Sequence, residues 1–156
     1  MLEHLKAHLK GKVVFLAVGN IMRSDDAAGP LLAEKIRGKV PFEVIDAGVS
    51  PENYLEKVIG LKPDCLVMFD AVDFGAKPGE FKELKAQELK TVNIFFTHNA
   101  SLSMAINYLQ SNLKLDIIIL IIQPKTITLG GDLSLEVAKS LDILADWFVS
   151  FSASNG

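Results

Sequence analysis

The sequence has little of what marks a secreted, membrane-spanning or nucleic-acid-binding protein. Its single cysteine, Cys65, excludes an internal disulfide and a cysteine-rich zinc site. The longest apolar runs, 13–18 and 117–122, are far shorter than the roughly 20 residues of a membrane span, and no signal-peptide cleavage site follows the first. Basic residues are not in excess, since 16 Lys and Arg stand against 19 Asp and Glu. We therefore expect a soluble, cytoplasmic protein without a nucleic-acid partner or membrane insertion.

Apolar residues, in contrast, are plentiful enough for a core. The chain has 156 residues, of which 49% are hydrophobic, and its net charge is −3. This length predicts a single domain over residues 1–156. A domain of this size buries about 68–70% of the surface that its unfolded chain exposes, so it needs neither a disulfide nor a structural metal to fold.

Short apolar runs alternate with amphipathic segments along the whole chain, which predicts strands that alternate with helices. The expected strands cover 12–18, 42–47, 65–69, 91–97 and 117–122, with a short edge strand at 81–84. The expected helices cover 26–40, a segment that begins at Ser50 and Pro51, 101–113 and 132–151. The run 117–122 is the most hydrophobic, so we expect it at the centre of the sheet. The fold class is therefore α/β, with a mostly parallel sheet between layers of helices.

Polar residues that directly follow the strands are the candidates for a site, because parallel strands end at one edge of a sheet and such folds bind ligands there. Asp26 lies in the segment after the first strand, Asp70 ends the third, and His98 ends the fourth. If the topology holds, these three side chains converge. Two carboxylates and one imidazole could hold a divalent metal with open positions, or perform acid–base chemistry.

Each candidate also has a purely structural interpretation. Asp25 or Asp26 could satisfy free N–H groups at the start of the next helix, and Asp70 could stabilise a turn. His98 could cap the helix that follows it. Other catalytic motifs have less support, since the chain contains neither G-x-G-x-x-G after the first strand nor G-x-S-x-G. Cys65 lies in the middle of a strand and is expected in the core.

Five sequence blocks, in order over roughly residues 12–130, resemble the hydrogenase maturation proteases. They are GNIMRSDDAAGPLLAEK, VIDAGVSPEN, DCLVMFDAVDFGAKPGE, THNASL and IIQPKTI. The likeness is greatest to the proteases that mature hydrogenases of the formate-hydrogenlyase type. Two positions depart from the family pattern, because Ala27 and Ala47 stand where many members have glycine. Each change adds a methyl group that could narrow the cleft or restrict positive φ locally.

This resemblance implies a three-layer α/β/α sandwich with a mostly parallel, mixed five-stranded sheet. It implies an endopeptidase that removes the C-terminal extension from the large-subunit precursor of a nickel–iron hydrogenase. Nickel already bound to the precursor would be the recognition element. The family's metal-contacting and catalytic positions carry over to Asp26, Asp70 and His98, the residues that the strand ends select. Without a thiolate, this set should hold nickel only weakly by itself, so the substrate would bring the metal.

Two other functions remain possible on the residues alone. One is a generic metallohydrolase, since one fold supports many functions. The other is a phosphoacceptor receiver domain, a signalling module whose site would comprise Asp25 and Asp26, Asp70, Thr97 and Lys125. Against the receiver, residues 19–24 separate the acidic pair from its strand, and Lys125 follows a proline instead of preceding one. Phosphorylation by a small phosphodonor would favour the receiver, and cleavage of a nickel-loaded precursor would favour the protease.

Overall fold

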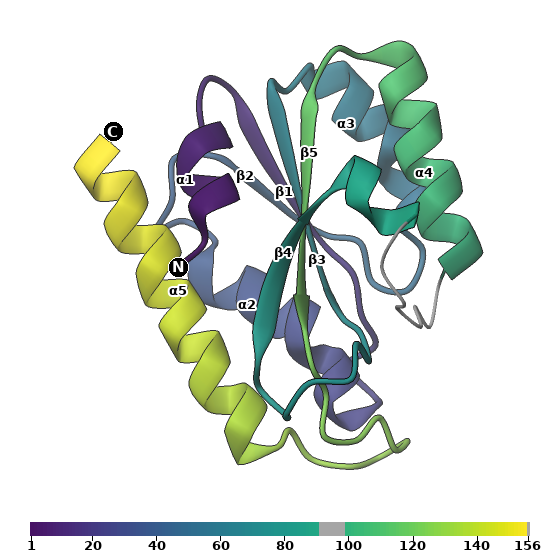
Figure 1. The fold of residues 1–156 in the computed structure, drawn as a ribbon, viewed down its shortest axis with the longest axis vertical. Helices are drawn as coiled ribbons and strands as arrows, with labels where there is room; N and C mark the ends of the chain where they lie inside the picture. Colours follow the sequence, from purple (N-terminus) through teal and green to yellow (C-terminus); the bar gives the residue numbers. More distant parts are fainter. Residues whose placement is uncertain (91–98, 156) are drawn as a thin grey trace.

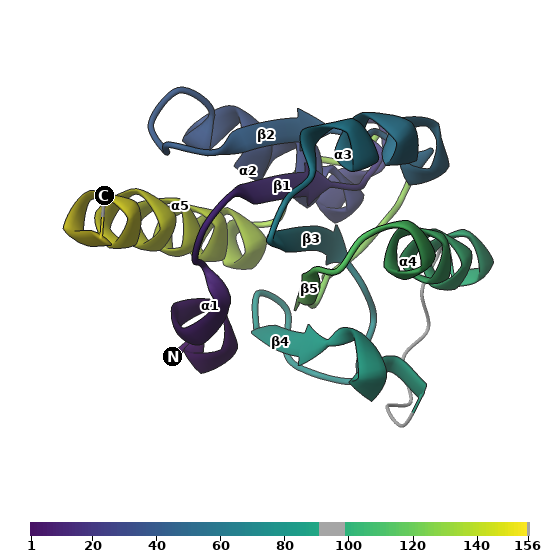
Figure 2. The same cartoon turned by 90° about the horizontal axis from the view of Figure 1, so that it is seen from above.

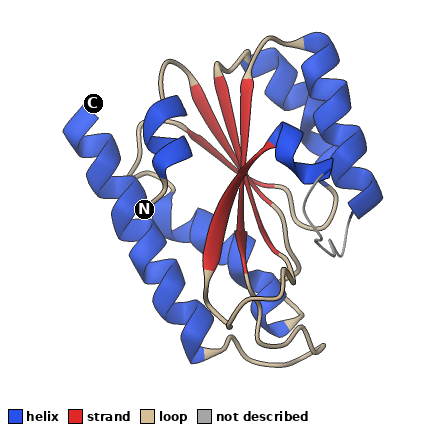
Figure 3. Cartoon of the chain, in the orientation of Figure 1, coloured by secondary structure: helices blue, strands red, loops and turns tan. Residues whose placement is uncertain are grey.

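A five-stranded mixed sheet forms the middle layer of the protein (Figures 1 and 3). The computed structural model describes residues 1–90 and 99–155. Its strands are β1 (Val13–Ala17), β2 (Glu43–Asp46), β3 (Cys65–Ala71), β4 (Phe81–Lys85) and β5 (Asp116–Ile122). They lie in the order β2-β1-β3-β5-β4, and only β4 runs antiparallel to its neighbour. The α/β class with a mostly parallel, mixed sheet is therefore confirmed.

Helices cover both faces of this sheet, as the view from above shows (Figure 2). One face carries α1 (Glu3–His8), α2 (Ala28–Ile36) and α5 (Leu135–Asn155). The other carries α3 (Leu55–Leu61) and α4 (Asn99–Asn112). Short 3-10 helices, η1 (Ser24–Ala27), η2 (Pro51–Tyr54) and η3 (Ala86–Lys90), join the larger elements. The result is the expected three-layer sandwich.

The continuous apolar runs of the sequence are explained by burial on both faces of the interior strands. In β1, Phe15 packs toward α2 and α5, and Leu16 packs toward α3 and α4. All seven residues of β3 are buried, including Asp70. On the α5 side, Phe15 meets Phe148 edge to face, with ring centroids 5.4 Å apart. Each interior strand thus contributes to two cores at once.

The expected position of the most hydrophobic strand is wrong. The central strand is β3, and β5 lies between it and the edge strand β4. Both strands are covered on two faces, so their hydrophobicity cannot distinguish them. The expected strand 91–97 lies outside the described residues. The predicted edge strand at 81–84 is β4, which pairs with β5 and completes the five described strands.

The expected helices differ from the observed ones at several places. The helix predicted over 26–40 begins as the 3-10 helix η1 and ends at Ile36, because Arg37 has an extended ψ of 129°. The segment after Ser50 also starts as a 3-10 helix, with Pro51 at its first position, and Ser50 makes no side-chain capping bond. The N-terminal helix α1 was not expected from its polar residues. Two contacts stabilise it: Leu5 is fully buried in the core on the α5 side, and the carboxylate of Glu83 accepts backbone N–H groups of the first turn.

None of the helices in residues 1–90 and 99–155 has the length and apolar character that crossing a membrane requires.

Truncation of a core side chain tests the burial of β5 on the face that packs against α5. Leu120 is fully buried, whereas Leu135 on α5 is 75% exposed. We expect Leu120→Ala to lower the free energy of unfolding by about 2–5 kcal/mol, since it leaves a cavity. The matched substitution Leu135→Ala should change it by no more than about 0.5 kcal/mol. Urea denaturation of both variants measures the difference, and equal losses would contradict this packing.

Candidate active site at the edge of the sheet

The parallel strands end at the edge of the sheet that lies at the bottom of Figure 1. By their positions in the chain, Asp26 and Asp70 lie at this edge. Asp26 belongs to η1, which follows β1, and Asp70 is the penultimate residue of β3. The two side chains are only 2% and 4% exposed. They are close enough for the charge of Asp26 to raise the pKa of Asp70. The structure thus brings together the two predicted carboxylates, while His98 lies outside the described residues.

Close backbone packing holds Asp26 at this edge. The backbone N–H of Asn20 donates to the carbonyl oxygen of Asp26 at 3.0 Å and to its carboxylate Oδ2 at 3.2 Å. A Cβ atom on Gly19 would collide with that carbonyl oxygen, and one on Gly29 would collide with the carbonyl oxygen of Val18. Glycine is required at both positions because the loop and the start of α2 press directly against the end of β1. The GN…G spacing of the first sequence block follows from this contact.

Asp70 lies at a position where the ionised form of its carboxyl group is unfavourable. Burial raises its pKa well above the usual range, the charge of Asp26 raises it further, and a hydrogen bond from the backbone of Ala71 opposes both effects. Its Oδ1 atom is enclosed and has no hydrogen-bond partner among the described residues. Two neighbouring buried carboxylates cannot both ionise cheaply unless a cation lies between them. The pair can therefore hold a proton or accept a divalent metal.

Two carboxylates alone do not form a complete metal site. Within residues 1–90 and 99–155, no cluster of three or more His, Cys, Asp or Glu side chains is placed to hold an ion. The oxygen donors of Asp26 and Asp70 suit a divalent cation, but a further ligand must come from elsewhere. Either His98 or a substrate that carries its own metal could supply it.

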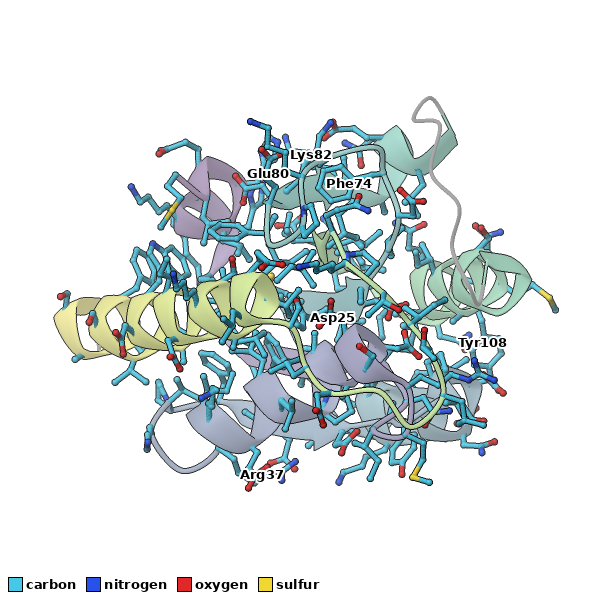
Figure 4. All side chains as sticks on the ribbon, turned by 90° about the horizontal axis from the view of Figure 1, so that it is seen from below. Asp25, Arg37, Phe74, Glu80, Lys82 and Tyr108 are labelled. Atoms are coloured by element: carbon cyan, nitrogen blue, oxygen red, sulfur yellow. The ribbon has the colours of Figure 1, made fainter. Side chains whose placement is uncertain are left out.

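The adjacent acid, Asp25, has a structural role. The sequence suggested that it accepts backbone N–H groups, but it did not indicate which ones. Its carboxylate accepts the backbone N–H of Lys125 at 2.8 Å, and the backbone N–H and hydroxyl of Ser134 at 2.7 and 2.9 Å. Ser134 Oγ in turn accepts the N–H of Val137 at 3.3 Å in the first turn of α5. Figure 4, which views the molecule from this edge, shows Asp25 beside the start of α5. Asp25 thus anchors the loop after β5, not the start of α2.

Gln123 is a second positioning residue, and sequence reasoning missed it. It is 7% exposed and directly follows β5. Its Oε1 accepts the backbone N–H groups of Phe74 at 2.8 Å and Ala76 at 3.2 Å, and its Nε2 donates to Asp73 at 3.1 Å. The loop after β3 is therefore fixed beside Asp70. A polar amide directly after an all-apolar strand, within IIQPKTI, is the signal that could have identified it.

The two alanine departures from the family pattern fit the structure. Ala27 has a φ of −75°, in the ordinary helical region, and Ala47 is not among the residues with positive φ. Both are buried, at 6% and 4% exposure. The added methyl groups therefore meet no backbone restriction at these positions.

The receiver interpretation finds no support at this edge. Its required lysine, Lys125, binds Asp25 through its backbone N–H, and its side-chain ammonium pairs with Glu136 at 3.3 Å. That side chain is 58% exposed. Thr97, its required hydroxyl residue, lies outside the described residues. The lysine that a receiver needs beside its phosphoacceptor is thus engaged with α5 instead.

Substitution of Asp70 tests the electrostatic cost of the pair. Because its folded-state pKa is raised, the folded protein retains a proton at pH values where the unfolded chain has lost it. Stability should therefore fall as pH rises from about 4, the ordinary carboxyl pKa, to the folded-state pKa.

With a chelator present, we expect Asp70→Asn to melt above the parent at pH 8 and the difference to shrink toward pH 4. A gain of about 2–4 °C corresponds to 1 kcal/mol in a domain of this size. An equal or lower melting temperature at pH 8 would contradict this cost.

The same change at Asp25 should have the opposite effect. Asp25→Asn turns an amide NH2 toward backbone N–H donors and leaves one of them without an acceptor. We expect a loss of about 1–3 kcal/mol in the free energy of unfolding. Asp132→Asn, on an exposed side chain of the same loop, is the control. Urea denaturation measures all three proteins, and a neutral Asp25→Asn would show that the network is dispensable.

Comparison with known proteins agrees with this geometry. A family model described as hydrogenase maturation protease matches residues 27–150. The hydrogenase 3 maturation protease of Escherichia coli (strain K12) is 43% identical over 116 residues, which cover 71% of this chain and 72% of that protein.

Solved structures give the same result. The [NiFe] hydrogenase maturation protease HycI from Thermococcus kodakarensis KOD1 matches with a TM-score of 0.85 and 30% identity, over 97% of this chain and 99% of that chain. The solution structure of the endopeptidase HycI from Escherichia coli matches with a TM-score of 0.80 and 31% identity, over 90% and 91% of the two chains. The chain therefore belongs to the hydrogenase maturation protease family and is a peptide hydrolase, as its resemblance to the proteases of the formate-hydrogenlyase type predicts.

Proposed function

We propose that this protein removes the C-terminal extension from the nickel-loaded large-subunit precursor of a nickel–iron hydrogenase. In this proposal, Asp26, Asp70 and His98 contact the nickel that the precursor carries, at the point where cleavage occurs. The reaction would take place in the cytoplasm. Membership of the family supports the substrate, and the sequence position of the three residues supports their role.

The observation that carries the proposal is the buried pair of Asp26 and Asp70. Burial and the neighbouring charge raise the pKa of Asp70, which is the cost of holding two acids together. A divalent cation relieves that cost, because it binds both carboxylates in their charged form. The two carboxylates are thus well suited to a substrate that presents a metal ion.

The donor set also explains why the metal would arrive with the substrate. Carboxylate oxygens are harder ligands than the thiolates that favour nickel, and the single thiol, Cys65, is buried in β3, where burial raises its pKa to about 12. The enzyme alone would hold nickel weakly. A precursor that lacks nickel would therefore leave the site incomplete, and cleavage would report that metal insertion is finished.

Loss of the proposed ligands should abolish processing without unfolding the protein. Asp26→Asn keeps the shape of the side chain but removes the charge that a cation requires, and His98→Ala removes the nitrogen ligand. We expect neither variant to convert a nickel-loaded precursor to its shorter form on a denaturing gel. Asp46→Asn, an exposed acid at the end of β2 that accepts only the nearby N–H of Gly48 in the described structure, should process normally.

The wild-type protein is assayed in parallel on the same precursor without nickel, and thermal melts establish that each variant is folded. Full processing by Asp26→Asn, or equal processing of nickel-free precursor, would contradict nickel recognition. Phosphate transfer from acetyl phosphate to Asp70, with no precursor cleavage, would favour the receiver interpretation instead.

A further inference from the structure

A group of exposed apolar side chains surrounds the edge where Asp26 and Asp70 lie. The group, called the apolar rim below, consists of Ile21, Met22, Val49, Ile127 and Leu129, which are 68%, 61%, 47%, 39% and 63% exposed. They supply half of the ten large hydrophobic side chains that are exposed in the described part of the chain. All five come from the loops after β1, β2 and β5, which begin at the same edge of the sheet.

Hydrogen bonds tie these loops into one surface. The N–H of Gly19 donates to the carbonyl of Gly48 at 2.8 Å, which joins the loops after β1 and β2. The N–H of Gly130 donates to the carbonyl of Met22 at 2.7 Å, which joins the loops after β1 and β5. The hydroxyl of Ser24, a residue held at a φ of 49°, donates to the carbonyl of Asp132 at 2.6 Å. The rim is therefore preorganised, and a partner would bind it at little entropic cost.

Several polar groups beside the rim are satisfied within the molecule, and the exposed Arg23 is a charged side chain among them. Lys125 pairs with Glu136, and the hydroxyls of Thr126 and Thr128 bond to each other at 2.7 Å. A surface that combines exposed apolar side chains with internally satisfied polar groups resembles the core of a protein interface more than an ordinary solvated loop.

The buried acids need such a surface. With 2% and 4% exposure, Asp26 and Asp70 offer a substrate almost no contact area of their own. Stable recognition of a protein typically buries about 800 Å² on each partner. The area must therefore come from the surroundings of the site, and the rim loops begin at the same edge of the sheet. A second copy of this chain seated on the rim would cover the acids and block the edge.

We propose that the apolar rim is the docking surface for the folded large-subunit precursor, which binds it through an apolar surface of its own beside the cleavage point. This inference rests on the proposed function and adds a source of affinity outside the three proposed metal ligands. The rim supplies binding that is the same in the ground state and the transition state, so it determines KM and leaves the chemical step unchanged.

The test is the steady-state kinetics of precursor processing by the full chain. The double variant Ile21→Ser/Leu129→Ser removes two exposed side chains from two different loops of the rim. We expect its KM for the nickel-loaded precursor to rise about tenfold or more, with kcat within about twofold of the parent and an unchanged melting temperature. Ile143→Ser, on an isoleucine that is 50% exposed on α5, is the matched control and should behave as the parent.

Each result decides between the alternatives. An unchanged KM in the double variant, or a fall in kcat alone, would overturn the rim as a docking surface while leaving the proposed function intact. Absence of precursor cleavage by the wild-type protein would overturn the proposed function and this inference together. Sedimentation of both proteins identifies the other occupant: a wild-type dimer that becomes monomeric in the double variant, with KM unchanged, would assign the rim to self-association.

Discussion

Repulsion between two carboxylates that the fold removes from water is the constraint around which this structure is arranged. Asp26 and Asp70 come from different elements, and burial together with the charge of Asp26 disfavours the ionised form of Asp70 and raises its pKa. The interior strands, buried on both faces, oppose relaxation of this pair because any movement of β3 would disturb both cores. The cores therefore supply the stability that allows an unfavourable pair of charges to persist.

The loops at this edge are also held firmly, and buried polar side chains hold them. Asp25 binds the loop after β5, and Gln123 binds the loop after β3. Neither residue belongs to the proposed ligand set, yet each fixes the backbone next to it. The two adjacent acids thus have different roles: Asp25 holds the loop after β5, and Asp26 belongs to the candidate site. Because binding of a large protein substrate gains from rigid surroundings, this scaffold also bears on recognition.

Much of this arrangement could be predicted from the sequence, because parallel strands with continuous apolar runs leave few topologies open. The edge that carries Asp26 and Asp70 follows from that rule alone. The roles of Asp25 and Gln123 could not be predicted, since their partners lie about a hundred and about fifty residues away along the chain. The helix α1 was missed for a similar reason: its first turn is stabilised by Glu83, a residue of β4. Local patterns do not contain such contacts. The proposed ligand His98 stays a prediction, as it lies outside the described residues.

The contact between α1 and β4 has a consequence for handling the protein. Among the strands of residues 1–90 and 99–155, β4 lies outermost at its end of the sheet, and such a strand can pair with another molecule unless something obstructs it. Here α1 lies beside β4 (Figure 2). The backbone N–H groups of His4 and Leu5 donate to the Glu83 carboxylate. Trimming the first helix would remove that contact, and it would also take Leu5, and Leu2 before it, out of the core on the α5 side. Both losses expose surface that is covered in the intact protein, so the damage would emerge as aggregation during purification.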